Sequence, residues 1–202
     1  PRIENRSILL NLQVNSSSVI KKVTAEINGN LFELSKNYDV DNFSGVYTGE
    51  AWMNYFDKPG VYTINISTEN EFNGSSSFLV DFEYLTLLAV SLDQNALNFG
   101  VVEPGAFSET KTISVINKGN VGIDLEIYGS DLESGSNKIN VSNIGFNFDL
   151  ISGKLDYRPK LFGFNLSSGL ERKKEVSFRL DLPTTTIPST YAGNMYLAGV
   201  EA

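Results

Sequence analysis

Residues 57–68 read DKPGVYTINIST, and this stretch contains both signals that decide the fold. The Pro59–Gly60 pair predicts a change of chain direction, because proline presets a turn and glycine tolerates the dihedral angles that turns require. Directly afterwards Tyr62, Ile64 and Ile66 alternate with polar residues. A period of two is typical of a β-strand with one buried face and one wet face. The stretch therefore predicts a turn that leads into an amphipathic strand.

The same alternation recurs along the chain, with turn signals such as Asn28–Gly29 and Lys118–Asn120 between the runs. Regular short strands punctuated in this way indicate an antiparallel sandwich or barrel, and no stretch has the 3.6-residue period of a helix. The predicted inward-facing residues are Ile8, Leu10, Leu12, Val14, Val23, Ala25, Ile27, Phe78, Val80, Phe82, Tyr84, Ile113, Val115, Ile123, Leu125, Ile127, Val176, Phe178, Leu180 and Leu182.

The chain of 202 residues is long for one β-sandwich and suits two, since such a domain has about 100 residues. The boundary is expected near residues 84–92, where one strand runs on without Gly or Pro toward the next turn signals. We therefore predict an all-β protein with one sandwich domain over residues 1–86 and a second over residues 87–202.

Two longer motifs resemble known families. The GVYTG of residues 45–49 and the PGVY of residues 59–62 are similar to immunoglobulin-like domains of archaeal cell-surface and S-layer-type glycoproteins. Residues 97–129 and the end of the chain, residues 178–202, resemble a second immunoglobulin-like group of prokaryotic surface proteins, in which the end forms a closing hairpin. The resemblance implies two tandem immunoglobulin-like sandwiches in an exported protein. It also implies that the Tyr62 hydroxyl bonds back to the main chain, as in a tyrosine corner.

Composition narrows the chemistry. The chain has no His and no Cys, so the usual nucleophile–base pairs and the usual zinc and haem sites are excluded, and we predict that it is not an enzyme. The net charge is −8, and both predicted domains are acidic, which argues against nucleic-acid binding. No apolar run reaches the ~18 residues of a membrane-spanning helix.

Seven Asn-X-Ser sequons occur where random placement predicts roughly three. They predict N-glycosylation, which favours an archaeal rather than a bacterial source; the alternative is that Asn and Ser are simply common on β-protein surfaces and in turns. The predicted glycosylation sites are Asn5, Asn15, Asn42, Asn65, Asn73, Asn140 and Asn165.

Two further clusters have competing interpretations. Asp39 and Asp41 place two carboxylates in one loop, the oxygen-rich arrangement that Ca²⁺ prefers, but a solvated turn uses the same residues. No other cofactor is predicted. Trp52, Tyr55 and Phe56 could stack on sugars if they were exposed; the alternation favours Trp52 as a core or inter-sheet residue, with the other two rings packed at the end of the domain.

These features together predict a structural glycoprotein subunit of an archaeal cell-surface layer or extracellular filament, with itself or other surface subunits as partners. The alternative is an adhesin or carbohydrate-binding module displayed at the cell surface. Assembly is expected through sheet edges or through residues 1–14, an alternating segment that could be donated to a neighbour's sheet. The competing interpretation makes that segment the ordinary first strand of its own domain.

Overall fold

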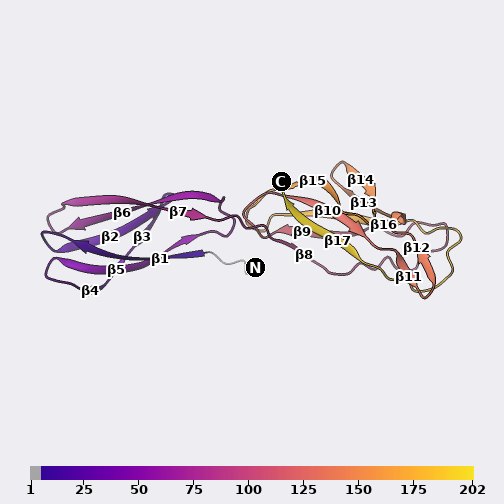
Figure 1. The fold of residues 1–202 in the computed structure, drawn as a ribbon, viewed down its shortest axis with the longest axis horizontal. Helices are drawn as coiled ribbons and strands as arrows, with labels where there is room; N and C mark the ends of the chain where they lie inside the picture. The colour runs from indigo at the N-terminus through magenta and orange to yellow at the C-terminus, as the bar shows by residue number, and fades with distance from the viewer. Residues whose placement is uncertain (1–5) are drawn as a thin grey trace. The chain divides into compact units, whose positions relative to one another are not determined.

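The computed structural model of the chain describes residues 6–202. Its elements are strands apart from one short 3₁₀ turn, η1 (Val141–Asn143), and every strand pair is antiparallel. The chain divides into two compact units after Thr86, and Figure 1 shows two layers of strands in each. The predicted all-β class with two sandwich domains is confirmed.

The first domain contains seven strands among residues 6–86, arranged as two facing sheets. The sheet orders are β1-β5-β4 and β3-β2-β6-β7. The strands are β1 (Arg6–Asn15), β2 (Ile20–Ile27), β3 (Asn30–Glu33), β4 (Ser35–Asp39), β5 (Ser44–Met53), β6 (Gly60–Asn70) and β7 (Ser75–Tyr84).

The alternation predicted the core of this domain. Val23, Ala25 and Ile27 of β2 are almost fully buried, and so are Ile64 and Ile66 of β6. Strand β1 pairs with β5 along its whole length and contributes buried side chains to the same core. Residues 6–15 are therefore the ordinary first strand of their own domain.

Local turn chemistry sets the register of these strands. Asn28 and Gly29, both with positive φ, form the two-residue turn between β2 and β3, as expected for an Asn–Gly hairpin. At the start of β6 the Tyr62 hydroxyl donates a hydrogen bond of 2.7 Å to the carbonyl oxygen of Lys58. The tyrosine corner implied by the resemblance is confirmed.

The strand orders of residues 6–86 match strands B to G of an immunoglobulin sandwich. In the A-to-G naming of that fold, β1-β5-β4 are strands B, E and D, and β3-β2-β6-β7 are C′, C, F and G. Only Leu34 separates β3 from β4, so these two edge strands share one side of the sandwich. The other two edge strands, β1 and β7, therefore share the opposite side, and among residues 6–86 no strand lies between them.

The second domain also has two main sheets, with orders β14-β13-β16-β9-β8 and β15-β10-β17, and a small hairpin of β11 and β12. Its strands are β8 (Val90–Leu92), β9 (Lys111–Asn117), β10 (Ile123–Gly129), β11 (Leu132–Ser134), β12 (Asn137–Ile139), β13 (Ile144–Phe148), β14 (Ile151–Lys154), β15 (Lys160–Leu166), β16 (Lys173–Leu180) and β17 (Met195–Glu201).

Three phenylalanines, Phe148, Phe164 and Phe178, lie at the centre of this core and are almost fully buried. The Phe148 and Phe164 rings pack edge to face at 5.0 Å. Phe148 and Phe178 come from one sheet and Phe164 comes from the other, so the aromatic cluster joins the two layers.

The described strands of the second domain match strands of an immunoglobulin sandwich up to strand F. Strands β8-β9-β16-β13 correspond to A, B, E and D, and β10 and β17 correspond to C and F. No strand of residues 87–202 pairs with the outer edge of β17, where strand G would lie. The expected closing hairpin is wrong, because β16 and β17 belong to different sheets and residues 181–194 cross between them.

Candidate functional site

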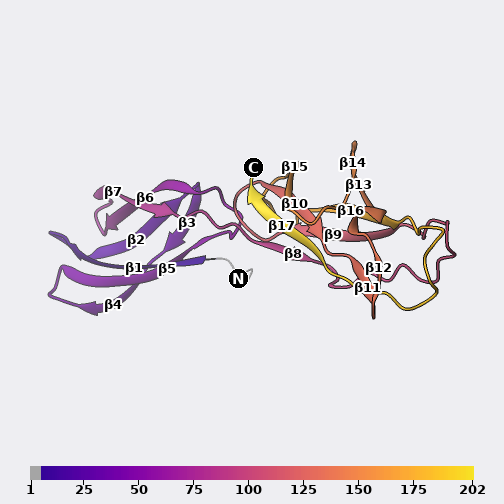
Figure 2. The ribbon, with the colours of Figure 1, turned by 45° about the vertical axis from the view of Figure 1, so that its right-hand side comes forward.

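The open side of the second domain contains an apolar cavity of about 750 Å³, here called the edge groove. It lies between two extended segments, residues 94–104 after β8 and residues 186–195 before β17. These segments continue the two edge strands, β8 and β17, whose ribbons lie side by side in Figures 1 and 2. The strands touch where Val90 packs against Gly199, so the groove opens beyond that contact.

The first wall of the edge groove is a strand-like segment outside the sheet. Leu97, Phe99 and Val102 pack against the core, while Asn98 and Val101 are exposed. The segment ends at a turn in which Gly105 has a φ of +82°, and Gly105 then donates to the carbonyl oxygen of Leu182. This wall thus resembles a strand that has left its partner β9 and directs apolar side chains inward.

Two sets of hydrogen bonds fix the second wall to the rest of its domain. The Tyr191 hydroxyl donates to the carbonyl oxygen of Ile187 at 2.9 Å, a second tyrosine corner just before β17. Ala192 and Glu133 exchange backbone hydrogen bonds of 2.8 and 3.1 Å, which join the wall to β11. Met195 begins β17 and packs against the core from this side.

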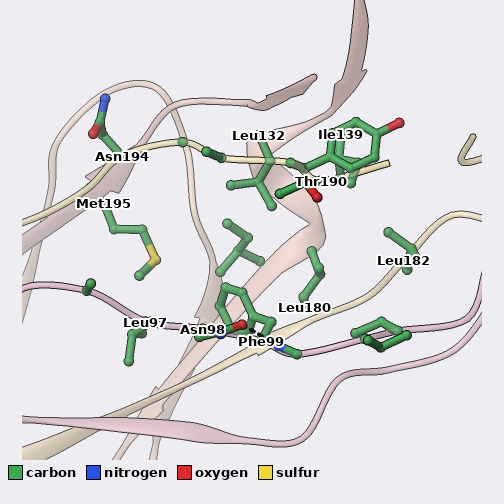
Figure 3. Close-up of a pocket in the computed structure, with 18 of the residues that line it drawn as sticks. Leu97, Asn98, Phe99, Leu132, Ile139, Leu180, Leu182, Thr190, Asn194 and Met195 are labelled. Atoms are coloured by element: carbon green, nitrogen blue, oxygen red, sulfur yellow. Dashed lines mark hydrogen bonds between the residues drawn. The ribbon is translucent and has the colours of Figure 1, made fainter. Parts of the chain in front are cut away.

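The floor of the edge groove is the apolar end of the core. Figure 3 shows the two walls facing each other across it, with Leu97 and Phe99 on one side and Met195 and Thr190 on the other. The floor residues are Ile113, Leu132, Ile139, Ile144, Leu180 and Leu182.

Acidic groups alone supply the charge at the rim of the groove within the described chain. Glu103 lines the groove and no Lys or Arg is among its lining residues, while Asp93 lines a small neighbouring pocket together with Gln94 and Asn95. The backbone N–H of Ser114 donates to Asp93 at 2.9 Å, and this hydrogen bond holds the pKa of that carboxyl below its ordinary value. Asp93 is therefore charged at neutral pH.

The open side of the first domain is also apolar. Phe78 and Val80 lie on the inward face of β7, opposite Ile66 and Ile64, yet they are 49% and 41% exposed. Both were predicted to face the core, and they do lie on that face of the sheet. They stay accessible because no strand of residues 6–86 covers the gap between β1 and β7.

The carboxylates proposed for calcium serve different local partners. Asp39 forms an ion pair with Lys36, and this hydrogen bond raises the pKa of the lysine. Asp41 accepts from the Phe43 N–H at 2.8 Å and from the Ser44 hydroxyl at 3.0 Å, which lowers the pKa of the Asp41 carboxyl. Among residues 6–202 no group of three or more acidic side chains is gathered around a shared point.

The sequon asparagines lie mainly on the surface. Asn5 lies outside the described residues, and Asn65 on the central strand β6 is half-buried, with a buried Oδ1 that accepts no hydrogen bond from the described residues. The exposed members are Asn15, Asn42, Asn73, Asn140 and Asn165.

Local structure distinguishes the exposed sequons. Asn42 and Asn73 lie in tight loops of the first domain, and Asn15 ends β1. Asn140 caps η1 through its Oδ1 and donates from its Nδ2 to the Tyr157 hydroxyl at 2.8 Å. Its Nδ2, the atom that a glycan would modify, is therefore already engaged.

The prediction for Trp52 is wrong. Its neighbours Ala51 and Met53 are buried at 0% and 2% exposure, so the strand alternation turns Trp52 outward, where it is 48% exposed. The sequence interpretation took the alternation to place Trp52 inside, whereas β5 places its neighbours Ala51 and Met53 there. Tyr55 is buried and packs edge to face on half-buried Phe56, as expected for rings at the end of the domain.

Sequence reasoning did not find the edge groove. A signal existed in residues 97–100, LNFG, in which Leu97 and Phe99 alternate with Asn98 and Gly100 shortly before the Pro104–Gly105 turn. The alternation predicts apolar side chains on one face, but it does not say that the backbone lacks a partner. That information resides in the strand order.

Comparisons with known proteins identify no family. No family model and no curated protein matches the chain. The chain is similar in structure to a chain from work described as "Chaperone-tip adhesin complex is vital for synergistic activation of CFA/I fimbriae biogenesis", with a TM-score of 0.46 and 11% identity over 100% of this chain and 78% of that one. Among residues 6–202 no helix has the length and hydropathy needed to cross a membrane.

Proposed function

We propose that the chain is a non-enzymatic structural subunit of an archaeal cell-surface layer or extracellular filament. One observation carries the proposal: within residues 6–202 each sandwich has one apolar side that no described strand covers, between β1 and β7 in the first domain and at the edge groove in the second. Uncovered sheet edges pair readily with other chains, and soluble monomers usually protect them. Subunits with such edges are suited to assemble with one another.

Surface glycosylation fits the same role. The exposed sequons on both domains support an extracellular glycoprotein, and the glycans would be attached away from the core. Mass spectrometry of the native protein should find sugar on Asn42 and Asn73, which lie in exposed loops. Half-buried Asn65 should be unmodified. Bare asparagine at both exposed loops would remove glycosylation from the proposal.

Electron microscopy of native material tests the structural role directly. Ordered filaments or lattices that contain this chain and form without added ligand are expected. Monodisperse single particles in native extracts, together with a monomeric sedimentation profile of the purified chain at high concentration, would refute the role. Residues 1–14 are not proposed as the donated segment, because β1 already fills its place in the first domain.

Exposure of Trp52 favours a second candidate, an adhesin or carbohydrate-binding module. Trp52 lies on the outer face of the β1-β5-β4 sheet, and Leu9, which is 72% exposed, is on the neighbouring strand. Exposed aromatic rings can stack on sugars. Glycan-array binding that is lost in Trp52→Ala and kept in Phe72→Ala, a change at another exposed ring, would support this alternative.

A further inference from the structure

Three loops of the first domain lie together at the end where β1 and β6 finish (Figures 1 and 2). The Ser16 N–H donates to the carbonyl oxygen of Phe43 at 3.1 Å and joins the β1–β2 loop to the β4–β5 loop. The Glu71 N–H donates to the carbonyl oxygen of Val19 at 3.0 Å and joins the β6–β7 loop to the β1–β2 loop. The joined loops, here called the loop tip, are residues 16–19, 40–43 and 71–74.

The loop tip gathers exposed apolar side chains. Phe72 is 77% exposed, the largest exposed fraction of any aromatic side chain among residues 6–202. The other apolar side chains of the tip, each about half exposed, are Val19, Val40 and Phe43. Apolar residues scattered singly on a surface are ordinary, whereas a group that separate loops bring together indicates a surface that something covers.

The sequon asparagine Asn73 directly follows Phe72 and is accessible. It is exposed, has a φ of +60°, and its side chain makes no hydrogen bond to a described residue. The turn around it is fixed, because the Asn70 Oδ1 accepts from the N–H groups of Phe72 at 3.0 Å and Gly74 at 2.8 Å. Ser75, which completes the sequon, is exposed as well. The turn therefore presents an open amide next to an open ring.

Asn165 provides a contrast, because it has the same preceding residue type. It follows Phe164 and has a similar φ of +50°. The Phe164 ring, however, is completely buried in the core, and the Asn165 Nδ2 donates to the carbonyl oxygen of Gly163 at 3.1 Å. A sugar on Asn165 would thus meet no exposed ring at the preceding residue, whereas a sugar on Asn73 would meet one.

We infer that the first sugar of an N-linked glycan on Asn73 packs against the Phe72 ring, so that the chain's own glycan covers the loop tip. One face of a sugar consists of C–H groups, and the negative face of an aromatic ring attracts such groups. Consecutive Cα atoms are about 3.8 Å apart, so the attached sugar and the ring stay within reach of each other. This inference rests on the proposed function and deepens it, because it names the glycan that is held and the side chain that holds it.

The attachment requires a sugar donor linked to a lipid phosphate and a transferase. The Asn73 Nδ2 forms a bond to the anomeric carbon of the sugar, and the bond from that carbon to the phosphate oxygen breaks. The lipid phosphate leaves with the electron pair, and one amide proton passes to a base of the transferase. The chain itself supplies the amide of Asn73 and the Ser75 hydroxyl that completes the sequon.

The full chain, secreted from a eukaryotic host, tests the inference with a defined sugar, N-acetylglucosamine. Trimming with endoglycosidase H leaves one such sugar on each modified asparagine. Mass spectrometry should find it on Asn73, and the ring current of Phe72 should shift the proton resonances of that sugar upfield. Phe72→Ala should abolish the shift. Phe107→Ala, the same change at an exposed ring of the second domain, should preserve it.

Thermal unfolding gives a second readout, followed by fluorescence of Trp52 in the first domain. Ser75→Ala removes the sequon but keeps Asn73, a residue type that suits the positive φ of this position. The trimmed glycoprotein should unfold about 2–5 °C above Ser75→Ala, and this difference should vanish when both proteins also carry Phe72→Ala. Equal differences with and without the ring would contradict the inference, because the sugar would then act without Phe72.

The outcomes separate this inference from the proposed function. If Asn73 stays bare in the secreted chain, or if the upfield shift survives in Phe72→Ala, the inference fails, even where micrographs show filaments or lattices. An equal shift of a sugar attached to Asn165 would overturn it too. If the sugar packs on the ring of a chain that never assembles, the inference stands and the structural role fails.

Discussion

Removing one buried amide should destabilise the second domain strongly. Asn117, at the end of β9, is completely buried. Its Nδ2 donates to the carbonyl oxygens of Val121 at 2.8 Å and Leu166 at 3.1 Å, and its Oδ1 accepts from the Gly119 N–H at 2.9 Å. Because β9 and β15 belong to opposite sheets, this one side chain links the two layers and also closes the turn before β10.

Asn117→Ala removes the side-chain hydrogen-bond partner of three buried main-chain groups, the carbonyls of Val121 and Leu166 and the N–H of Gly119. A buried group left unsatisfied costs about 1–3 kcal/mol, and the two carbonyls keep a second lone pair, so the lower half of that range applies to each. We expect the free energy of unfolding to fall by ~3–5 kcal/mol, a large part of the 5–15 kcal/mol typical of a domain. The melting temperature of the second domain should fall by roughly 15 °C.

Hydrogen exchange in a urea series measures this loss in the full chain. Peptides from β9 and β10 report the second domain, while fluorescence of Trp52, the single tryptophan, reports the first. The control Asn95→Ala removes an exposed amide and should change stability by less than ~0.5 kcal/mol. A loss below ~1 kcal/mol in Asn117→Ala would refute the reasoning, because the three hydrogen bonds would then be dispensable.

Three further changes test other parts of the structure. Gly119→Ala should cost ~3 kcal/mol in urea unfolding, since a Cβ at this position would overlap the Leu87 carbonyl oxygen; an unchanged midpoint would contradict that overlap. Asp93→Asn should make the free energy of unfolding less sensitive to acid. The pKa of Asp93 is lowered in the folded protein, so its carboxylate stabilises the fold above the ordinary pKa of about 3.9, and this stabilisation is lost as the pH falls through the lower folded value. The wild type should therefore be more stable than the variant at neutral pH, and this difference in stability should shrink near pH 3. A difference in stability between the two proteins that does not change with pH would contradict the stabilising role of the Asp93 carboxylate. Tyr62→Phe and Tyr191→Phe should each lower the free energy of unfolding by ~1 kcal/mol, because each variant loses one hydrogen bond to the main chain. Denaturant midpoints measure this loss, and unchanged midpoints in both variants would argue against the tyrosine corners.

Alternation predicted the core reliably where strands of the opposite sheet cover the inward face. The predicted inward residues of β2, β9, β10 and β16 are buried, because a strand of period two can bury only one face. At β7 the same pattern identified the correct face, but Phe78 and Val80 remain exposed. Burial also requires an opposing strand, and alternation within one strand carries no information about the other sheet.

Alternation was misassigned on β5. Trp52 was predicted to be a core or inter-sheet residue from the alternation around it, but that interpretation chose the wrong face of the strand. Strand parity placed Ala51 and Met53 inside, and a side chain cannot change face without a shift of register or a bulge. Alternation alone does not say which of the two faces of a short stretch such as residues 51–53 is buried; the pairing of β5 in its sheet decides it.

The sequence by itself determined the class of this protein: strand alternation, Asn–Gly and Pro–Gly turns, the Tyr62 corner and the absence of His and Cys are all local or compositional properties. Only the tertiary structure decided which strands are neighbours, that β16 and β17 lie in different sheets, and that each sandwich has an apolar side left open by the strands of residues 6–202. The physical reason is that pairing joins residues far apart in the chain. An unpaired strand edge has the same local sequence as a paired one, so the edge groove becomes visible only when all the strands are in place.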